Sequence, residues 1–164
     1  MKISVNGINM LKKLEGCVIQ NDKHVIYDDQ TGSPVNTNAP LPRGATIGYG
    51  HLIKPGEKFR NGISEAKATE LLRADIATAE RTVQNNITVP LSQNQFDALV
   101  SLAYNIGANN FATSTVVKYI NDPNFHSPLY KNLESAWMAW NRSQGKISTG
   151  LSNRRKQEWC LFNA

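Results

Sequence analysis

The spacing of apolar residues changes near residue 17 and again near residue 56. Ile8, Leu11 and Leu14 recur at helical intervals, and Gly16 follows as a natural stop. The pattern therefore predicts a first helix that ends at Glu15. From Cys17 to Leu52 the helical period disappears, and after Pro55-Gly56 it returns and persists to the end of the chain.

The middle stretch has the pattern of short strands joined by turns. Val18-Ile19 and Val25–Tyr27 are predicted strands, with a turn at Asn21–Lys23 between them. Thr46–Gly50 predicts a further strand, and its alternating glycines indicate that another group approaches the backbone closely. We expect a small antiparallel sheet here.

The remaining chain predicts helices. Ser64 is expected to cap a helix that runs to about Gln84, and Ser92 begins a capping box for a helix that ends at Gly107. Further helices are predicted at Phe111–Ile120, around Leu133–Trp140 and after a cap at Ser152, with the tryptophans expected in the core rather than as a sugar platform. The predicted fold class is α+β and predominantly α.

Composition narrows the class of protein. The 164 residues are enough for one domain with a core, and no apolar run is long enough to span a bilayer. The start of the chain lacks the apolar centre of a signal peptide, so we expect synthesis in a cytoplasm without an export signal. The net charge of +5 favours an anionic partner, although no DNA-reading motif accompanies it. Cys17 and Cys160 are too few for a disulfide framework or a zinc site, and we expect free, largely buried thiols and no cofactor.

Three side chains in the N-terminal third suggest hydrolytic chemistry. Glu15 ends the first predicted helix, a second carboxylate lies at Asp28 or Asp29, and the Thr46 hydroxyl begins the glycine-rich strand. Hydrolysis of a glycosidic bond needs one carboxyl group to donate a proton to the leaving oxygen and another to act on the opposite face of the sugar. Thr46 is placed to hold a water between them.

These residues resemble the motif of the phage-type lysozymes, glycoside hydrolase family 24. Glu15 stands in Leu-Glu-Gly, Asp29 follows Tyr27 as Tyr-x-Asp, and Thr46–His51 reads Thr-Ile-Gly-Tyr-Gly-His. The similarity continues through Tyr104–Gly107 to Asn153–Arg155 and so covers nearly the whole chain. The intervals around the aspartate are longer than in the best-known members, with insertions around Gln20–His24 and Gly32–Arg43.

The resemblance implies a two-lobed lysozyme fold. Residues 14–63 would form a sheet-containing lobe, residues 64–84 a connecting helix, and residues 85–164 a helical lobe on which residues 1–13 pack. The polysaccharide would lie between the lobes. The implied reaction is hydrolysis, with inversion, of the β-1,4 bond between N-acetylmuramic acid and N-acetylglucosamine.

The resemblance also implies individual roles. Glu15 would be the general acid, and Asp29 and Thr46 would activate a water; Leu52, Tyr104 and Ser114 would bind substrate, and Arg154 would position the acid. Asp28 is the alternative to Asp29, which we prefer because it matches Tyr-x-Asp and because strand alternation puts Asp28 on the other face. His51 is expected to support the structure rather than catalyse.

The cellular role follows from the same resemblance. We expect a monomeric endolysin, a bacteriolytic enzyme of a phage, held in the host cytoplasm until a holin opens the membrane and then acting on peptidoglycan. No nucleic-acid partner is expected, and membrane contact only through the basic surface. A lytic transglycosylase, which cuts the same bond with one glutamate, is the alternative, and a non-catalytic cell-wall-binding module is a third; neither explains Asp29 and Thr46.

Overall fold

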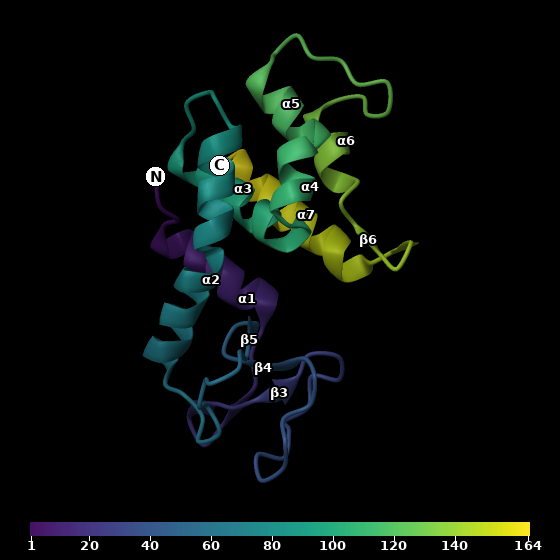
Figure 1. The fold of residues 1–164 in the computed structure, drawn as a ribbon. Coiled ribbons are helices and arrows are strands. Elements are labelled where there is room, and N and C mark those ends of the chain that lie inside the picture. Colours follow the sequence, from purple (N-terminus) through teal and green to yellow (C-terminus); the bar gives the residue numbers. More distant parts are fainter. The chain divides into compact units, whose positions relative to one another are not determined.

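The computed structural model describes residues 1 to 164 and has an α+β fold dominated by helices (Figure 1). The helices are α1 Val5–Glu15, α2 Glu65–Asn86, α3 Gln93–Ile106, α4 Ala108–Thr113, α5 Thr115–Asn121, α6 Leu133–Met138 and α7 Thr149–Phe162. The strands are β1 Ile19–Gln20, β2 Lys23–His24, β3 Tyr27–Asp28, β4 Ala45–Ile47, β5 His51–Leu52, β6 Arg142–Ser143 and β7 Lys146–Ile147. The predicted fold class is confirmed.

The chain divides into two compact units. Residues 9–75 form one, which we call the sheet unit, and residues 1–8 with 76–164 form the other, which we call the helical unit. The boundary falls inside α1 and inside α2, so both connections between the units are helical.

The sheet unit is organised around the antiparallel sheet β3-β4-β5. A separate hairpin, β1-β2, turns at Asn21 and Asp22, which both have positive φ, 50° and 61°. The predicted turn was one residue too long, because Lys23 already pairs with Gln20 in the ladder. Asparagine and aspartate tolerate the left-handed region that a two-residue hairpin turn requires.

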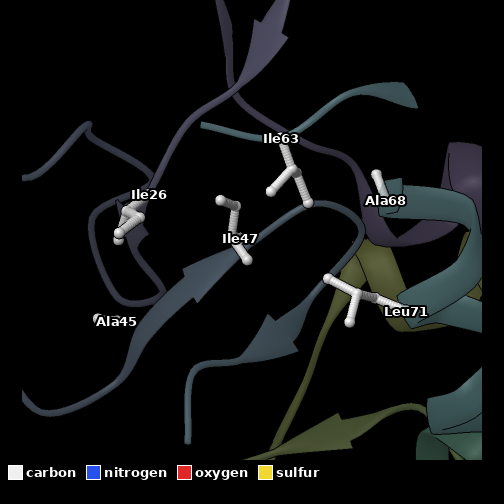
Figure 2. Packing of buried hydrophobic residues seen from close by; sticks show 6 residues of the cluster. All are labelled: Ile26, Ala45, Ile47, Ile63, Ala68 and Leu71. Carbon is white, nitrogen blue, oxygen red and sulfur yellow. The ribbon is translucent and has the colours of Figure 1, made fainter. Parts of the chain in front are cut away.

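The core of the sheet unit joins the sheet to the first turns of α2. Figure 2 shows this cluster, in which strand and loop residues meet two side chains of the helix. Its members are Ile26, Ala45, Ile47, Ile63, Ala68 and Leu71. Ile47 is fully buried, and burying such a side chain contributes about 1.5–3 kcal/mol.

In the helical unit α7 packs against α3 and α6. Helix α3 begins with the predicted capping box. Ser92 Oγ accepts a hydrogen bond from the Gln95 N–H, and the Gln95 side chain accepts one from the Ser92 N–H. Trp137 is fully buried, and its ring lies 5.7 Å from that of Trp159. The core role predicted for the tryptophans is thus confirmed for Trp137, whereas Trp140 and Trp159 are half-buried.

The prediction of a single helix at Phe111–Ile120 was wrong, because two helices occupy this segment. Ser114 separates α4 from α5 in an extended conformation, with φ −67° and ψ 152°. Its Oγ accepts a hydrogen bond from the Val117 N–H at 3.3 Å and so caps α5. A serine competes with the helix backbone for such bonds, and here the local cap interrupts the helix.

The C-terminal helix also starts earlier than predicted. Ser148 caps α7 through a bond from the Leu151 N–H, whereas Ser152 lies inside the helix and donates its hydroxyl to the Ser148 carbonyl at 2.9 Å. The prediction of buried thiols was wrong too, since Cys17 and Cys160 are free and exposed. The β6-β7 hairpin was not predicted.

None of the helices has the length and apolar character needed to cross a bilayer. The structure contains no group of three or more histidine, cysteine or acidic side chains placed to hold a metal ion.

Candidate active site

One face of the three-stranded sheet carries Tyr27, Thr46 and Leu52. Tyr27 pairs with Thr46, and Thr46 pairs with Leu52, across neighbouring antiparallel strands. Side chains directly opposite each other in such a ladder point to the same face. The face therefore presents a phenol, a hydroxyl and an exposed leucine side by side, of which Tyr27 and Thr46 are buried and Leu52 is 59% exposed.

The Thr46 hydroxyl has a defined orientation. Its Oγ1 donates to the Gly44 carbonyl at 2.9 Å. A hydroxyl has one proton to donate and two lone pairs to accept. With the proton directed at Gly44, the lone pairs of the Thr46 hydroxyl remain as acceptors.

Gly44 links Thr46 to Asp29. The same carbonyl accepts the Asp29 N–H at 3.4 Å, so both candidate residues are attached to one backbone group. Gly44 has φ +87°, a conformation that residues with a side chain rarely adopt. The long Gly32–Arg43 segment therefore returns to the sheet at a fixed point beside Asp29.

The two neighbouring aspartates have different environments. Asp28 is half-buried, and its Oδ1 accepts from the N–H groups of Gln30 at 2.7 Å and Thr31 at 3.3 Å, which closes the turn after β3. Asp29 is exposed, and its carboxylate has no such turn-closing bonds. Asp28 is thus engaged in the turn, whereas Asp29 is not.

Glu15 enters the site from the C-terminal end of α1. The side chain is half-buried, and Gly16 follows with φ +69°. A Cβ built at Gly50 would lie 3.6 Å from Glu15 Oε2, so the backbone after β4 comes close to the carboxylate. This is the close approach that the alternating glycines indicated.

Tyr27 lies within electrostatic reach of both candidate carboxylates. Burial makes the largest contribution to raising the pKa of Tyr27, followed by the charge of Asp29. A hydrogen bond from the Gly50 backbone lowers this pKa, and the charge of Glu15 raises it. The charges of Glu15 and Asp29 therefore both act on this phenol. Sequence reasoning used Tyr27 only as the first residue of Tyr-x-Asp and did not assign it to the site.

A polar network centred on Glu65 holds the elements around the site. Glu65 accepts from Lys12 of α1 at 2.7 Å, contacts His24 Nε2 of the β1-β2 hairpin at 2.7 Å, and accepts from the Tyr49 hydroxyl at 2.8 Å. Burial raises the pKa of Glu65, but the hydrogen bonds from these three groups outweigh it and bring the value to about 2. Burial and the bond to Glu65 raise the pKa of Tyr49.

This network predicts a loss of stability in acid. The pKa of Glu65 is below its unfolded value of 4.5, so the stabilisation is present above pH 4.5 and is lost as the pH falls toward about 2. Since the Glu65 side chain is 56% exposed, solvent screens the interaction, and we expect Glu65→Gln to cost only about 1 kcal/mol at pH 7. Urea unfolding at pH 7, 4 and 3 measures both effects.

The matched control is Glu70→Gln, which removes an exposed carboxylate paired only with Lys67. It should leave the acid dependence unchanged, whereas Glu65→Gln should flatten it. An equal pH dependence for Glu65→Gln and the wild type would contradict the assignment.

His51 is held by two carboxylates, as its expected supporting role requires. Its Nδ1 lies 2.8 Å from Asp75 Oδ2, and its Nε2 lies 3.0 Å from Glu57 Oε2. The ring is buried, and it connects β5 to α2 and to the loop after β5.

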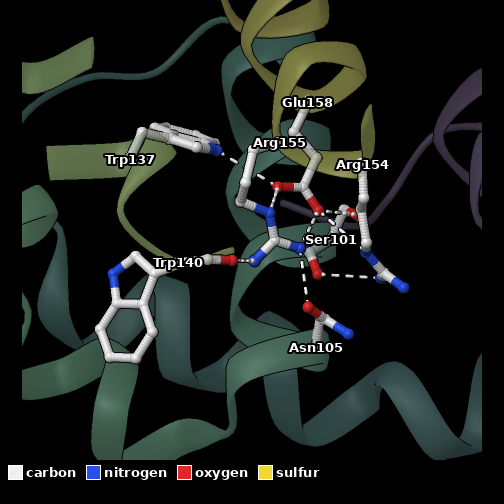
Figure 3. Close-up of polar contacts among 7 residues, drawn as sticks. All are labelled: Ser101, Asn105, Trp137, Trp140, Arg154, Arg155 and Glu158. Atoms are coloured by element: carbon white, nitrogen blue, oxygen red, sulfur yellow. Dashed lines mark hydrogen bonds and ion pairs between the residues drawn. The ribbon is translucent and has the colours of Figure 1, made fainter. Parts of the chain in front are cut away.

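The other predicted site residues lie in the helical unit. Tyr104 is half-buried on α3, and Ser114 is buried with its hydroxyl capping α5. Arg154 is buried, with its Nε 3.1 Å from Glu158 Oε1 and its Nη2 3.3 Å from the Ser101 carbonyl (Figure 3). Thus Glu15, Asp29, Thr46 and Leu52 share the sheet unit, and the remaining three share the helical unit.

A model of the phage lysozyme family matches residues 12–158, and the chain belongs to this family. It is 37% identical over 165 residues to the endolysin of Salmonella phage P22, which covers 99% of this chain and 98% of that protein. A mutant of P22 lysozyme superposes with a TM-score of 0.75 at 34% identity, covering 100% of this chain and 99% of that one. The muramidase domain of SpmX from Asticaccaulis excentricus gives 0.74 at 29% identity, covering 99% and 98%.

Some relatives are much longer than this chain. The endolysin of Bacillus phage PZA is 36% identical over 168 residues, which is 100% of this chain and 56% of that protein. The endolysin of Bacillus phage B103 is 37% identical over 99% of this chain and 54% of its own length. The chain thus spans about half the length of these two relatives.

Proposed function

We propose that this chain is a muramidase that hydrolyses the β-1,4 bond between N-acetylmuramic acid and N-acetylglucosamine in peptidoglycan. The observation that carries the proposal is that Asp29 and Thr46 bond the same Gly44 carbonyl in one compact unit, in which Thr46 pairs with Tyr27 and the charges of Asp29 and Glu15 both act on Tyr27. The endolysin and muramidase names of its relatives support the same substrate.

Each of the three residues has a role that fits its surroundings. Glu15 gives its proton to the oxygen of the leaving sugar as the bond from the anomeric carbon breaks. Asp29 takes a proton from a water whose oxygen bonds to the anomeric carbon, and Thr46 accepts the second hydrogen of that water and so orients it. Attack from the face opposite the leaving group inverts the configuration, which requires carboxyl groups about 6.5–9.5 Å apart.

The remaining roles are part of the same proposal. Leu52, Tyr104 and Ser114 contact substrate, and Arg154 positions the acid. The protein acts as a monomer, without a nucleic-acid partner, and waits in the host cytoplasm for a holin before it reaches the wall. The net charge of +5 suits an anionic polymer and supports this proposal.

Product analysis tests the reaction. Mass spectrometry of fragments released from purified peptidoglycan should show hydrated reducing ends carrying N-acetylmuramic acid. Anhydro ends would instead identify a lytic transglycosylase, which needs neither Asp29 nor Thr46. Salt-sensitive binding without any released fragment would identify a binding module and overturn the enzyme proposal.

A pair of substitutions tests the choice of carboxylate. We expect Asp29→Ala to lower kcat by about 10²–10⁴-fold, because the attacking water loses its base. Asp28→Ala should leave kcat within a few-fold and instead reduce stability, since two N–H groups of the turn lose their acceptor. Kinetics on soluble glycan strands, with the unfolding midpoint of each variant, separate the two effects. A larger loss of kcat for Asp28→Ala would exchange their roles.

A further inference from the structure

A pocket opens beside strand β4, which carries Thr46. It has a volume of about 560 Å³ and belongs entirely to the sheet unit. Its walls come from the end of the Gly32–Arg43 segment, from the start of β4 and from the loop that follows β5. Its lining includes Leu41, Arg43, Leu52, Lys54, Glu57 and Arg60.

The walls of this pocket are fixed before any ligand arrives. Pro40, Pro42 and Pro55 restrict the backbone on both sides. The Ala45 N–H donates to the Pro42 carbonyl at 3.1 Å, and Arg60 Nη1 donates to the Ala39 carbonyl at 2.8 Å. A preformed site loses little conformational freedom on binding.

The pocket adjoins the candidate active site through Leu52. Leu52, in its wall, pairs with Thr46 across the sheet, so its side chain lies on the same face as the Thr46 hydroxyl. A ligand that contacts both Thr46 and its partner Leu52 would therefore reach the edge of the pocket.

Positive charge exceeds negative charge in the pocket lining. Arg43, Lys54 and Arg60 are exposed, and none of them forms an ion pair with a carboxylate. The acidic residue of the lining, Glu57, has its Oε2 bonded to the Lys54 N–H at 2.8 Å and to His51 Nε2 at 3.0 Å. These bonds engage the Glu57 carboxylate within the protein. The three cations of the lining exceed this one carboxylate by two charges.

Apolar surface accompanies these cations. Leu41, Leu52 and the prolines line the pocket, and the Leu52 side chain is 59% exposed. The pocket therefore suits a ligand that combines carboxylates with small apolar groups. The sugars of peptidoglycan are neutral where the peptide is attached, because the lactyl carboxyl group forms an amide with it. The attached peptide carries free carboxylates and alanine methyl groups.

We propose that this pocket binds the peptide stem of peptidoglycan, with Arg43 and Lys54 recognising its carboxylates. The inference rests on the proposed muramidase function and adds a determinant of substrate specificity to it. The stem binds equally before and during bond cleavage, so its contacts lower KM and leave kcat nearly unchanged.

The test combines a change in the protein with a change in the substrate. The protein variant is Arg43→Gln/Lys54→Gln, and the altered substrate is soluble peptide-bearing glycan strands whose carboxyl groups have been amidated. On native strands we expect the double variant to raise KM about tenfold, with kcat within twofold. On amidated strands the wild type should show the same rise in KM, and the variant should add no more than twofold.

The control is Lys58→Gln/Arg73→Gln, which removes two exposed cations from the same unit outside the pocket. It should keep KM on native strands within about twofold. Circular dichroism and unfolding midpoints establish that all variants are folded.

The outcomes separate the two proposals. If the wild type cleaves native strands but both double variants change KM equally, the pocket has no specific role and the muramidase proposal stands. A tenfold effect of Arg43→Gln/Lys54→Gln that persists on amidated strands would also overturn carboxylate recognition. Absence of cleavage by the wild type would instead contradict the muramidase proposal itself.

Discussion

Glu15→Gln is expected to lower turnover by about 10³-fold or more while the protein stays folded. An amide has no proton to give to the leaving oxygen, and general acid catalysis contributes about 10²–10⁴-fold. Glutamine has nearly the volume of glutamate, so the side chain still fits beside the Gly50 backbone. The measurement is the rate of reducing-end release from soluble glycan strands, with the unfolding midpoint measured in parallel.

Glu70→Gln is the appropriate control for this substitution. It removes the same charge from the same unit at an exposed position on α2, and it should retain wild-type turnover. Retained binding of glycan strands by Glu15→Gln would show that the substitution affects the reaction rather than recognition. Near wild-type turnover by Glu15→Gln would remove Glu15 from the mechanism.

Glu158→Gln is expected to cause the largest loss of stability, about 3–5 kcal/mol. Figure 3 shows this fully buried carboxylate at the centre of a network in the helical unit. Its Oε1 accepts from Ser101 Oγ at 2.8 Å and from Arg155 Nη2 at 3.0 Å, and its Oε2 accepts from Trp137 Nε1 at 3.2 Å. Arg154 Nε adds an ion pair at 3.1 Å. The amide would leave two buried guanidinium groups without this countercharge.

Urea denaturation at pH 7 measures this loss. Glu134→Gln is the control, because Glu134 is an exposed carboxylate in the first turn of α6, and its effect should stay within about 0.5 kcal/mol. In a chain of this length the expected loss for Glu158→Gln lowers the unfolding midpoint by roughly 10 °C or more. A loss below 1 kcal/mol would show that the two arginines are neutralised without Glu158.

The candidate site was predictable where its residues carry a local pattern. Glu15 ends a three-residue apolar repeat, and the alternating glycines after Thr46 indicated a close backbone approach, which Gly50 and Glu15 provide. The contribution of Tyr27 was not predictable in this way. The effect of the Asp29 and Glu15 charges on its pKa depends on the β3-β4 register and on where α1 ends, and residues distant in the sequence set both.

The different environments of Asp28 and Asp29 have a similar origin. From the sequence alone, alternation along a strand predicted that Asp28 and Asp29 point to opposite faces. The turn that engages Asp28 forms because the chain reverses at Gln30 and Thr31, where two N–H groups find its carboxylate. Which acceptor a backbone N–H bonds depends on the conformation of the loop, and local spacing does not give that conformation.

The sequence by itself determined the fold class and the ends of α1 and α3, because helical period, capping pairs and turn residues act within a few positions. Tertiary structure decided the break at Ser114, the start of α7 at Ser148 and the exposure of both cysteines. It also assembled the Glu158 network and the cationic pocket beside Thr46. These features depend on which distant segments pack together, because burial and pairing of polar groups are properties of the folded contacts rather than of local spacing.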